Sequence, residues 1–209
     1  MKIVPFIYND FDDLMANTYI VIDNKDCLIV DPSKSYDGLV RFIKKNGLTP
    51  RGILLTHGHC DHIRGVDILV DEFQIPVFIG FYDEELLKDA NKNLSVYING
   101  QQSVINAPTK TVSEKDELKL LSEPIRVIET PFHTKGSVCY YLKDSHILFS
   151  GDTLFKQSIG RDDFPHSSPK DKSGSLHKLM MLPDEVKVYP GHGEFTTIGE
   201  ERKYNPFVN

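Results

Sequence analysis

The segment THGHCDHIRG, at residues 56–65, brings together side chains that bind metal ions. Three histidines and one aspartate fall within six positions: His57, His59, His62 and Asp61. Imidazole and carboxylate groups suit zinc and related transition metals, whereas cysteine is the usual ligand of a purely structural zinc site. A pair of neighbouring histidines alone would be equally consistent with an exposed loop. Four candidate ligands in one loop favour a metal centre.

Three further candidate ligands each follow an apolar run that predicts a β-strand. His133 lies in TPFHTKGS, Asp152 in FSGDTLF and His192 in YPGHGE. Each run delivers its polar side chain to the edge of a sheet, where small and turn-forming residues let the backbone bend around a site. Each of the three is a weak signal by itself, because such residues are common in turns and on surfaces. Together with the first loop they make seven candidate ligands, enough for a two-metal site.

Segments with strand and helix periodicity alternate along the chain, with no repeat or low-complexity tract. The predicted strands occupy residues 2–8, 18–23, 26–30, 52–56, 76–79, 117–120, 125–130, 138–143, 146–150 and 186–189. The predicted helices occupy residues 36–46, 66–73, 83–93 and 173–182, with a short one near the C-terminus. The strands come in two batches, each followed by helices, which predicts two packed sheets with helices outside. A length of 209 residues fits one such domain, residues 1–209.

The composition argues against several classes of function. A net charge of −6 without a long basic run disfavours binding to nucleic acid or to an anionic membrane surface. The opening MKIVPFIYND is too short an apolar stretch for a signal peptide, and no later segment is long enough to span a bilayer. The three cysteines, Cys27, Cys60 and Cys139, lack paired spacing and fit reduced thiols. A cytoplasmic location is therefore expected.

In combination, these motifs resemble the metallo-β-lactamase superfamily, and within it the glyoxalase II-like (hydroxyacylglutathione hydrolase) branch. The similar segments extend over nearly the whole chain: THGHCDH, TPFHTKGS, SGDTLF with IGRDDFP, YPGHG, and the ending TTIGEERKYNPF. The resemblance implies an α/β fold of the αββα sandwich type, with two mixed sheets packed together and helices on their outer faces. It also implies that the site lies at one edge of the paired sheets.

The resemblance implies a role for each candidate ligand. The first metal would have three histidine ligands: His57, His59 and His133. The second metal would have a mixed set: Asp61, His62 and His192. Asp152 would bridge both ions, and Asp61 and Asp152 are the predicted catalytic carboxylates. Two zinc ions are expected, with iron and manganese as alternatives, and Asp31 is implied to support one of the histidines.

Features on the substrate side depart from the glyoxalase II pattern. Arg161, in IGRDDFP, is implied to be a basic contact to the substrate, but Asp163 stands where the longer enzymes tend to have tyrosine. Arg64 replaces one of the glycines that often follow HxHxDH, and is expected at the mouth of the site. The longer enzymes continue into a helical domain that contacts glutathione, whereas this sequence ends at Asn209. An open mouth and weak discrimination among carrier thiols are therefore expected.

The expected function is metal-dependent hydrolysis of a small-molecule acyl thioester, S-lactoylglutathione or a related thiol ester. A bound metal lowers the pKa of water from about 15.7 to near 7, which makes hydroxide available at neutral pH. The departing thiolate, with a pKa of about 8.5 if cysteine-like, needs no obligatory protonation. The sequence has no G-x-S-x-G nucleophile motif, and Cys60 is expected to point away from the metals.

Two alternatives use the same motifs. The first is a mononuclear iron persulfide dioxygenase, whose family shares HxHxDH and GR-x-DF, although PGHG at residues 190–193 favours hydrolysis. The second is a non-catalytic metal-binding module, which is disfavoured because none of the seven candidate ligands is missing. The sequence leaves the oligomeric state open.

Overall fold

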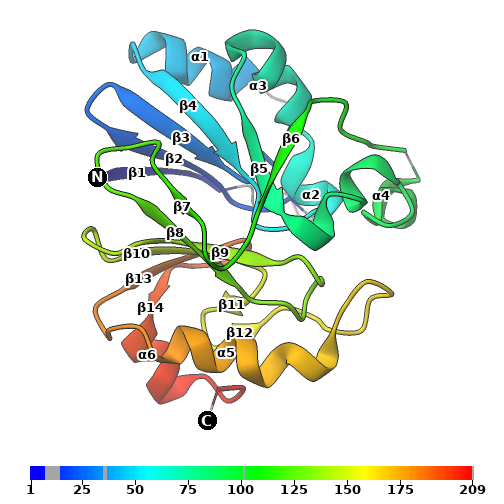
Figure 1. Cartoon of the computed structure of the whole chain (residues 1–209), viewed down its shortest axis with the longest axis vertical. Coiled ribbons are helices and arrows are strands. Elements are labelled where there is room, and N and C mark those ends of the chain that lie inside the picture. Colours follow the sequence, from blue (N-terminus) through cyan, green and yellow to red (C-terminus); the bar gives the residue numbers. More distant parts are fainter. Residues whose placement is uncertain (8–14, 35–36, 101, 209) are drawn as a thin grey trace.

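The computed structural model describes residues 1–7, 15–34, 37–100 and 102–208. Two six-stranded sheets pack face to face (Figure 1). The first sheet has the order β1 (Lys2–Phe6), β2 (Thr18–Asp23), β3 (Asp26–Val30), β4 (Thr49–Leu54), β5 (Val77–Gly80), β6 (Thr109–Val112). The second has the order β14 (Thr196–Thr197), β13 (Lys187–Pro190), β10 (Ile147–Gly151), β9 (Val138–Leu142), β8 (Ile125–Glu129), β7 (Glu117–Leu118). A two-stranded ribbon joins β11 (Leu154–Phe155) and β12 (Ser158–Ile159).

Both sheets are mixed. In the first, β1 to β3 pair antiparallel and β3 to β6 pair parallel. In the second, β10 and β13 are parallel, while the other neighbours are antiparallel. The parallel pairs matter for the site, because parallel strands present their carboxyl ends at the same edge of a sheet.

Helices cover the outer face of each sheet (Figure 1). The first sheet is covered by α1 (Asp37–Lys45) and α3 (Val66–Phe73), and the second by α5 (Lys172–Met180) and α6 (Ile198–Tyr204). The shorter elements are α2 (Cys60–Ile63), α4 (Ser95–Asn99), and the 3₁₀ turns η1 (Phe81–Asp83), η2 (Leu86–Lys88) and η3 (Pro169–Asp171). The predicted αββα sandwich is therefore confirmed. Among the described residues, no helix has the length and apolar character needed to cross a bilayer.

Three apolar layers hold the sandwich together. The central layer, between the sheets, contains Tyr19, Leu28, Leu54, Tyr140 and Phe149. The outer layers place buried side chains of α1 and α3 against the first sheet, and those of α5 and α6 against the second. Strands buried on both faces explain the continuous apolar runs of the sequence, because each such strand must satisfy two layers at once.

Most predicted elements are confirmed to within a few residues, but the helix predicted at 83–93 is wrong. That segment forms η1 and η2 with turns around them, and the next α-helix is α4. The side chain of Asp83 is buried, and the side chain of Asp89 accepts hydrogen bonds from the backbone N–H groups of Asn91 and Lys92. Such side-chain bonds compete with the helical ladder and favour a turn. Strands β6, β11, β12 and β14 were not predicted, because they are short and only partly apolar.

Candidate metal centre

All seven candidate ligands gather at one end of the sandwich, on loops that leave the ends of strands. The HxHxDH segment follows β4, and its second half forms the buried helix α2. His133 follows β8, Asp152 follows β10, and His192 follows β13. Since β10 and β13 are parallel, Asp152 and His192 leave at the same edge. The sequence pattern of a polar residue after each apolar strand therefore predicts this gathering correctly.

Three histidines form a compact group of ring nitrogens. Nε2 of His57 lies 3.1 Å from Nδ1 of His59, which lies 2.9 Å from Nε2 of His133. Ligand atoms on one tetrahedral zinc ion, each about 2.0–2.1 Å from it, are about 3.3 Å apart. The Nδ1 atom of His133 is 2.8 Å from the carbonyl oxygen of Arg161, to which it must donate, so Nε2 carries the free lone pair. This group could hold one ion.

A second group combines one aspartate and two histidines. Nε2 of His192 lies 3.2 Å from Oδ2 of Asp61, and Nε2 of His62 lies 3.8 Å from the same oxygen. The three ligand atoms of Asp61, His62 and His192 all lie within 4.8 Å of one another. This arrangement could hold a second ion.

The carboxylate of Asp152 lies between the two groups. Its Oδ1 is 3.3 Å from Nε2 of His62, and its Oδ2 is 3.5 Å from Nε2 of both His133 and His192. Within the described part of the chain, Oδ1 of Asp152 and Nε2 of His62 are buried and have no hydrogen-bond partner. Buried polar atoms without partners are costly, and a cation between them would satisfy both. The donor set therefore fits two metal ions with Asp152 shared between them.

Asp31 supports the site from behind, as the resemblance implies. Its Oδ2 is 2.9 Å from Nδ1 of His62, and it accepts hydrogen bonds from the hydroxyl (2.7 Å) and the backbone N–H (2.8 Å) of Thr56. The bond to Nδ1 orients the ring so that Nε2 of His62 faces Asp152. Asp31 has a positive φ of 47°, a conformation that few non-glycine residues adopt. The predicted set omits Thr56, since nothing in its type or position distinguishes it from an ordinary strand residue.

The two groups differ in protonation. Burial, with help from the neighbouring imidazole of His133, lowers the pKa of His59 to about 3, and burial also holds the pKa of His57 well below its usual range. Burial opposes protonation of His62 too, but the carboxylates of Asp152 and Asp61 outweigh it and raise its pKa well above the usual value. Burial therefore keeps His57 and His59 neutral, whereas His62, in the second group, retains a proton that an ion would replace.

A cavity of about 570 Å³ opens beside His192. Its other walls include Met15, Asn17 and Phe195. Nη1 of Arg64 lies 3.8 Å from the sulfur of Met15, which places Arg64 near this mouth, as expected. The cavity offers a small molecule both apolar and polar walls next to the second group.

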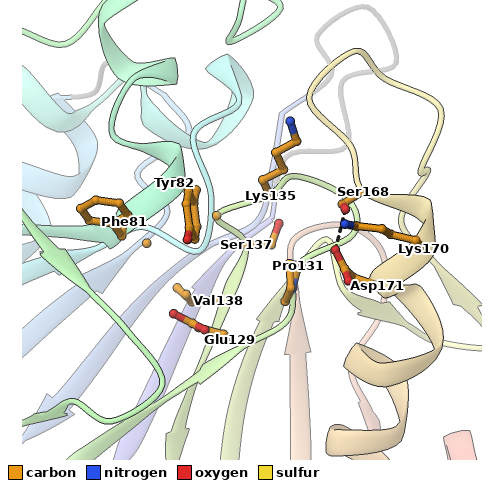
Figure 2. Close-up of a pocket in the computed structure, with 12 residues that line it drawn as sticks. Phe81, Tyr82, Glu129, Pro131, Lys135, Ser137, Val138, Ser168, Lys170 and Asp171 are labelled. Carbon is orange, nitrogen blue, oxygen red and sulfur yellow. Dashed lines mark hydrogen bonds between the residues drawn. The ribbon is translucent and has the colours of Figure 1, made fainter.

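A separate cavity of about 340 Å³ is lined in part by Lys135 and Ser137, shortly after His133 in the sequence (Figure 2). Phe81 and Tyr82 line one side of it, and Pro131 and Lys170 the other. None of the seven candidate ligands lines this cavity among the described residues. Of these two cavities, the one beside His192 is the one that adjoins a candidate ligand.

Arg161, the predicted substrate contact, lies close to the three-histidine group. Its guanidinium group stacks 4.6 Å from the ring centroid of Phe164, whose ring centroid is 5.4 Å from that of His59. The same guanidinium makes two hydrogen bonds, of 2.9 and 3.0 Å, to the carboxylate of Asp163. Its charge is therefore already partnered at the surface, which spacing along the sequence could not show.

Cys60 is not part of any of the side-chain clusters of the described residues that could hold a metal ion. It is fully buried in α2, and burial raises the pKa of its thiol to about 11. A thiol with a raised pKa is a poor nucleophile at neutral pH. The three cysteines of the described chain are all buried and free, which agrees with the expectation of reduced thiols.

Asp83 is a residue near the site that the sequence interpretation missed. It lies in the polar segment 83–93 that the sequence pattern assigned to a helix, but its carboxylate is buried between the HxHxDH loop and the loop that carries His133. One signal could have found it, because Asp83 follows an apolar strand as the other site residues do.

Comparison with known proteins supports the fold and the family. A probable metallo-hydrolase of Bacillus subtilis (strain 168), YqgX, is 36% identical over 197 residues, which cover 94% of this chain and 93% of the relative. The hydroxyacylglutathione hydrolase GloC of Haemophilus influenzae is 30% identical over 198 residues, covering 90% of this chain and 89% of the relative.

Solved structures show the same architecture. The B3 metallo-beta-lactamase BLEG-1 has a TM-score of 0.93 at 35% identity, covering 99% of both chains. TTHA1623, solved in a di-iron-bound form, has a TM-score of 0.84 at 33% identity and covers 98% of this chain and 99% of that one. ETHE1 from Myxococcus xanthus has a TM-score of 0.78 at 26% identity and covers 99% of this chain and 84% of that one. A family model of the metallo-beta-lactamase superfamily matches residues 11–192, and the chain belongs to this superfamily.

Proposed function

We propose that this protein is a two-metal hydrolase of small acyl thioesters, with S-lactoylglutathione or a related thiol ester as substrate. The observation that carries the proposal is the position of the Asp152 carboxylate, 3.3 Å from His62 and 3.5 Å from His133 and His192. A carboxylate shared between two groups of ligands is what a pair of ions requires. Zinc is the proposed ion, with iron and manganese as alternatives, and the di-iron form of TTHA1623 supports iron.

Each side chain has a defined task in this proposal. The groups that would hold the first ion are His57, His59 and His133, and those that would hold the second are Asp61, His62 and His192. When bound, the ions would supply an acidified water and polarise the substrate carbonyl. Burial raises the pKa of Asp152, but the imidazoles of His192 and His62 outweigh it and hold the pKa well below its usual range, so this carboxylate stays ionised.

The choice of a thioester rests on the relatives and on chemistry. GloC, at 30% identity over most of both chains, is named a hydroxyacylglutathione hydrolase. A thiolate with a pKa of about 8.5 can leave without a general acid. The cavity beside His192 offers the apolar walls of Phe195 and Met15 to an acyl group. No nucleic acid, membrane or protein partner is part of this proposal.

A second candidate is hydrolysis of β-lactams. The supporting observation is the likeness to BLEG-1, a B3 metallo-beta-lactamase, at 35% identity over 99% of both chains. The same ligand groups would serve, because both reactions add water to a polarised carbonyl carbon. The persulfide dioxygenase alternative instead requires a single iron ion and consumes oxygen.

One preparation can separate the three reactions. The protein is analysed for metals and then assayed for release of thiol from S-lactoylglutathione, for opening of a chromogenic cephalosporin, and for oxygen uptake with glutathione persulfide. We expect two ions per chain, with the highest kcat/KM for the thioester and loss of activity on treatment with a chelator. One iron ion per chain together with oxygen uptake would contradict the proposal, and so would a higher kcat/KM for the cephalosporin.

A further inference from the structure

Asp83 is a buried carboxylate that joins the two loops carrying the three-histidine group. Its side chain is fully buried. Oδ2 accepts hydrogen bonds from the backbone N–H of Gly58 at 2.9 Å and from the hydroxyl of Thr134 at 2.7 Å. Oδ1 accepts from the backbone N–H of Gly136 at 2.8 Å. Gly58 lies between His57 and His59, and Thr134 follows His133, so a single carboxylate links all three histidines.

Both loops approach Asp83 more closely than a side chain would allow. A Cβ atom at Gly136 would lie 2.3 Å from the backbone nitrogen of Asp83 and 2.5 Å from its Oδ1. A Cβ atom at Gly58 would lie 3.0 Å from the carbonyl oxygen of Asp83 and 2.7 Å from Cβ of Leu86. Glycine is therefore required at both contacts, and the loops are closed around the carboxylate.

Asp83 touches one ligand group and not the other. Among the described residues, its carboxylate accepts hydrogen bonds from Gly58, Thr134 and Gly136, which all belong to the loops of the three-histidine group. The second group is held by other bonds, including the one that Nδ1 of His62 donates to the carboxylate of Asp31. A change at Asp83 should therefore act on the first ion.

We propose that Asp83 is a positioning residue that fixes the separation of the two loops and thereby the affinity of the three-histidine group for its ion. This rests on the ligand assignment of the proposed function. His59 and His133 are 74 residues apart in sequence. The chain between them therefore does not fix the distance between their ring nitrogens, and noncovalent contacts between the two loops must do so. Groups that orient metal ligands in this way typically affect metal affinity about 10- to 100-fold.

The variant Asp83→Asn isolates this role because it keeps the size and shape of the side chain. An amide offers one acceptor oxygen and one NH₂ donor, whereas Asp83 faces three donors. If the amide oxygen faces Gly58 and Thr134, the NH₂ group meets the N–H of Gly136. If the amide is flipped, the NH₂ group meets the N–H of Gly58. In either orientation the NH₂ donor of the amide faces a backbone N–H donor, and this repulsion forces the loops apart.

Asp67→Asn is the matched control. The carboxylate of Asp67, in α3, accepts hydrogen bonds from the backbone N–H groups of Asn106 (3.0 Å) and Ala107 (2.9 Å). It therefore also joins a helix to a loop through backbone donors, but its hydrogen bonds within the described residues go to Asn106 and Ala107 and not to a candidate ligand loop. A general loss of loop anchoring should affect both variants alike.

The test is a titration of metal-stripped protein with Co²⁺, which reports both affinities and the visible spectrum of the bound ion, together with thermal unfolding of the stripped protein. We expect Asp83→Asn to weaken one ion by about 10- to 100-fold, to leave the other nearly unchanged, and to alter the spectrum of the weakened ion. We expect Asp67→Asn to lower the unfolding temperature and leave both affinities unchanged.

Three outcomes would overturn the proposal: wild-type affinities in Asp83→Asn, equal weakening of both ions, or the same affinity loss in the control. If Asp83→Asn does not fold, Thr134→Val decides, because it removes one donor to Asp83 and leaves the backbone bonds in place. It should weaken the same ion, and wild-type affinity in it would overturn the proposal. A wild-type protein that binds two ions without hydrolysing thioesters would contradict the proposed function alone.

Discussion

The carboxylate of Asp31 lies 2.9 Å from Nδ1 of His62, and this bond directs the other ring nitrogen of His62 into the metal centre. Asp31 also anchors Thr56, the residue immediately before the HxHxDH segment, through two hydrogen bonds. One side chain therefore sets both the tautomer of a ligand and the start of the ligand loop. Its positive φ of 47° is maintained by these three bonds together.

Asp31→Asn should weaken the second ion by about 10- to 100-fold, because the amide cannot accept all three hydrogen bonds. Asparagine tolerates a positive φ, so the backbone conformation is retained, whereas Asp31→Ala would add strain at φ 47°. The measurement is a two-site ion titration of Asp31→Asn beside Asp83→Asn. The two variants should weaken different ions, and weakening of the same ion by both would contradict the division into two groups.

Asp152→Ala should abolish hydrolysis and reduce the bound metal, because both groups lose the carboxylate that lies between them. Cys60→Ala should keep most of the activity, since its buried thiol, with a pKa raised to about 11, takes no part in the chemistry. Elemental analysis and steady-state assays of both variants test this pair. A Cys60→Ala protein that is folded, holds its metal and lacks activity would show that the thiol participates.

Much of the site could be predicted from the sequence, because each ligand type follows a strand and the strand pattern is strong. The strand pattern singles out the seven candidate ligands, and the structure brings them together. Asp83 escapes prediction because it begins a polar stretch with a helical pattern, and only the tertiary structure shows that its carboxylate turns inward. The partnership of Arg161 with Asp163 was missed for a similar reason, since two charges two residues apart meet only if the loop bends.

The ion pair of Arg161 and Asp163 makes a specific prediction for substrate choice. Their side chains are largely exposed, and exposed ion pairs contribute little to stability, so a substrate carboxylate can compete for Arg161. Arg161→Ala should raise KM by up to about 5-fold for carriers with a carboxylate. Asp163→Asn should lower it by a similar factor, because the guanidinium is released. The assay compares glutathione with an uncharged thiol carrying the same acyl group, and equal effects on both carriers would show that Arg161 does not contact the carrier.

The two ions should respond differently to pH. Carboxylates raise the pKa of His62 above its usual value against the effect of burial, so an ion entering the second group must displace a proton, and its affinity should fall as pH falls. The pKa values of His57 and His59 are lowered, mainly by burial, so neither imidazole holds a proton that an ion must displace, and the affinity of the three-histidine group should fall less steeply with pH than that of the second group between about pH 6 and pH 8. Competition titrations against a chromophoric chelator across this range measure both slopes. Equal slopes for the two ions would contradict the assignment. If the slopes differ, the ion whose affinity changes more steeply with pH is the one that occupies the second group.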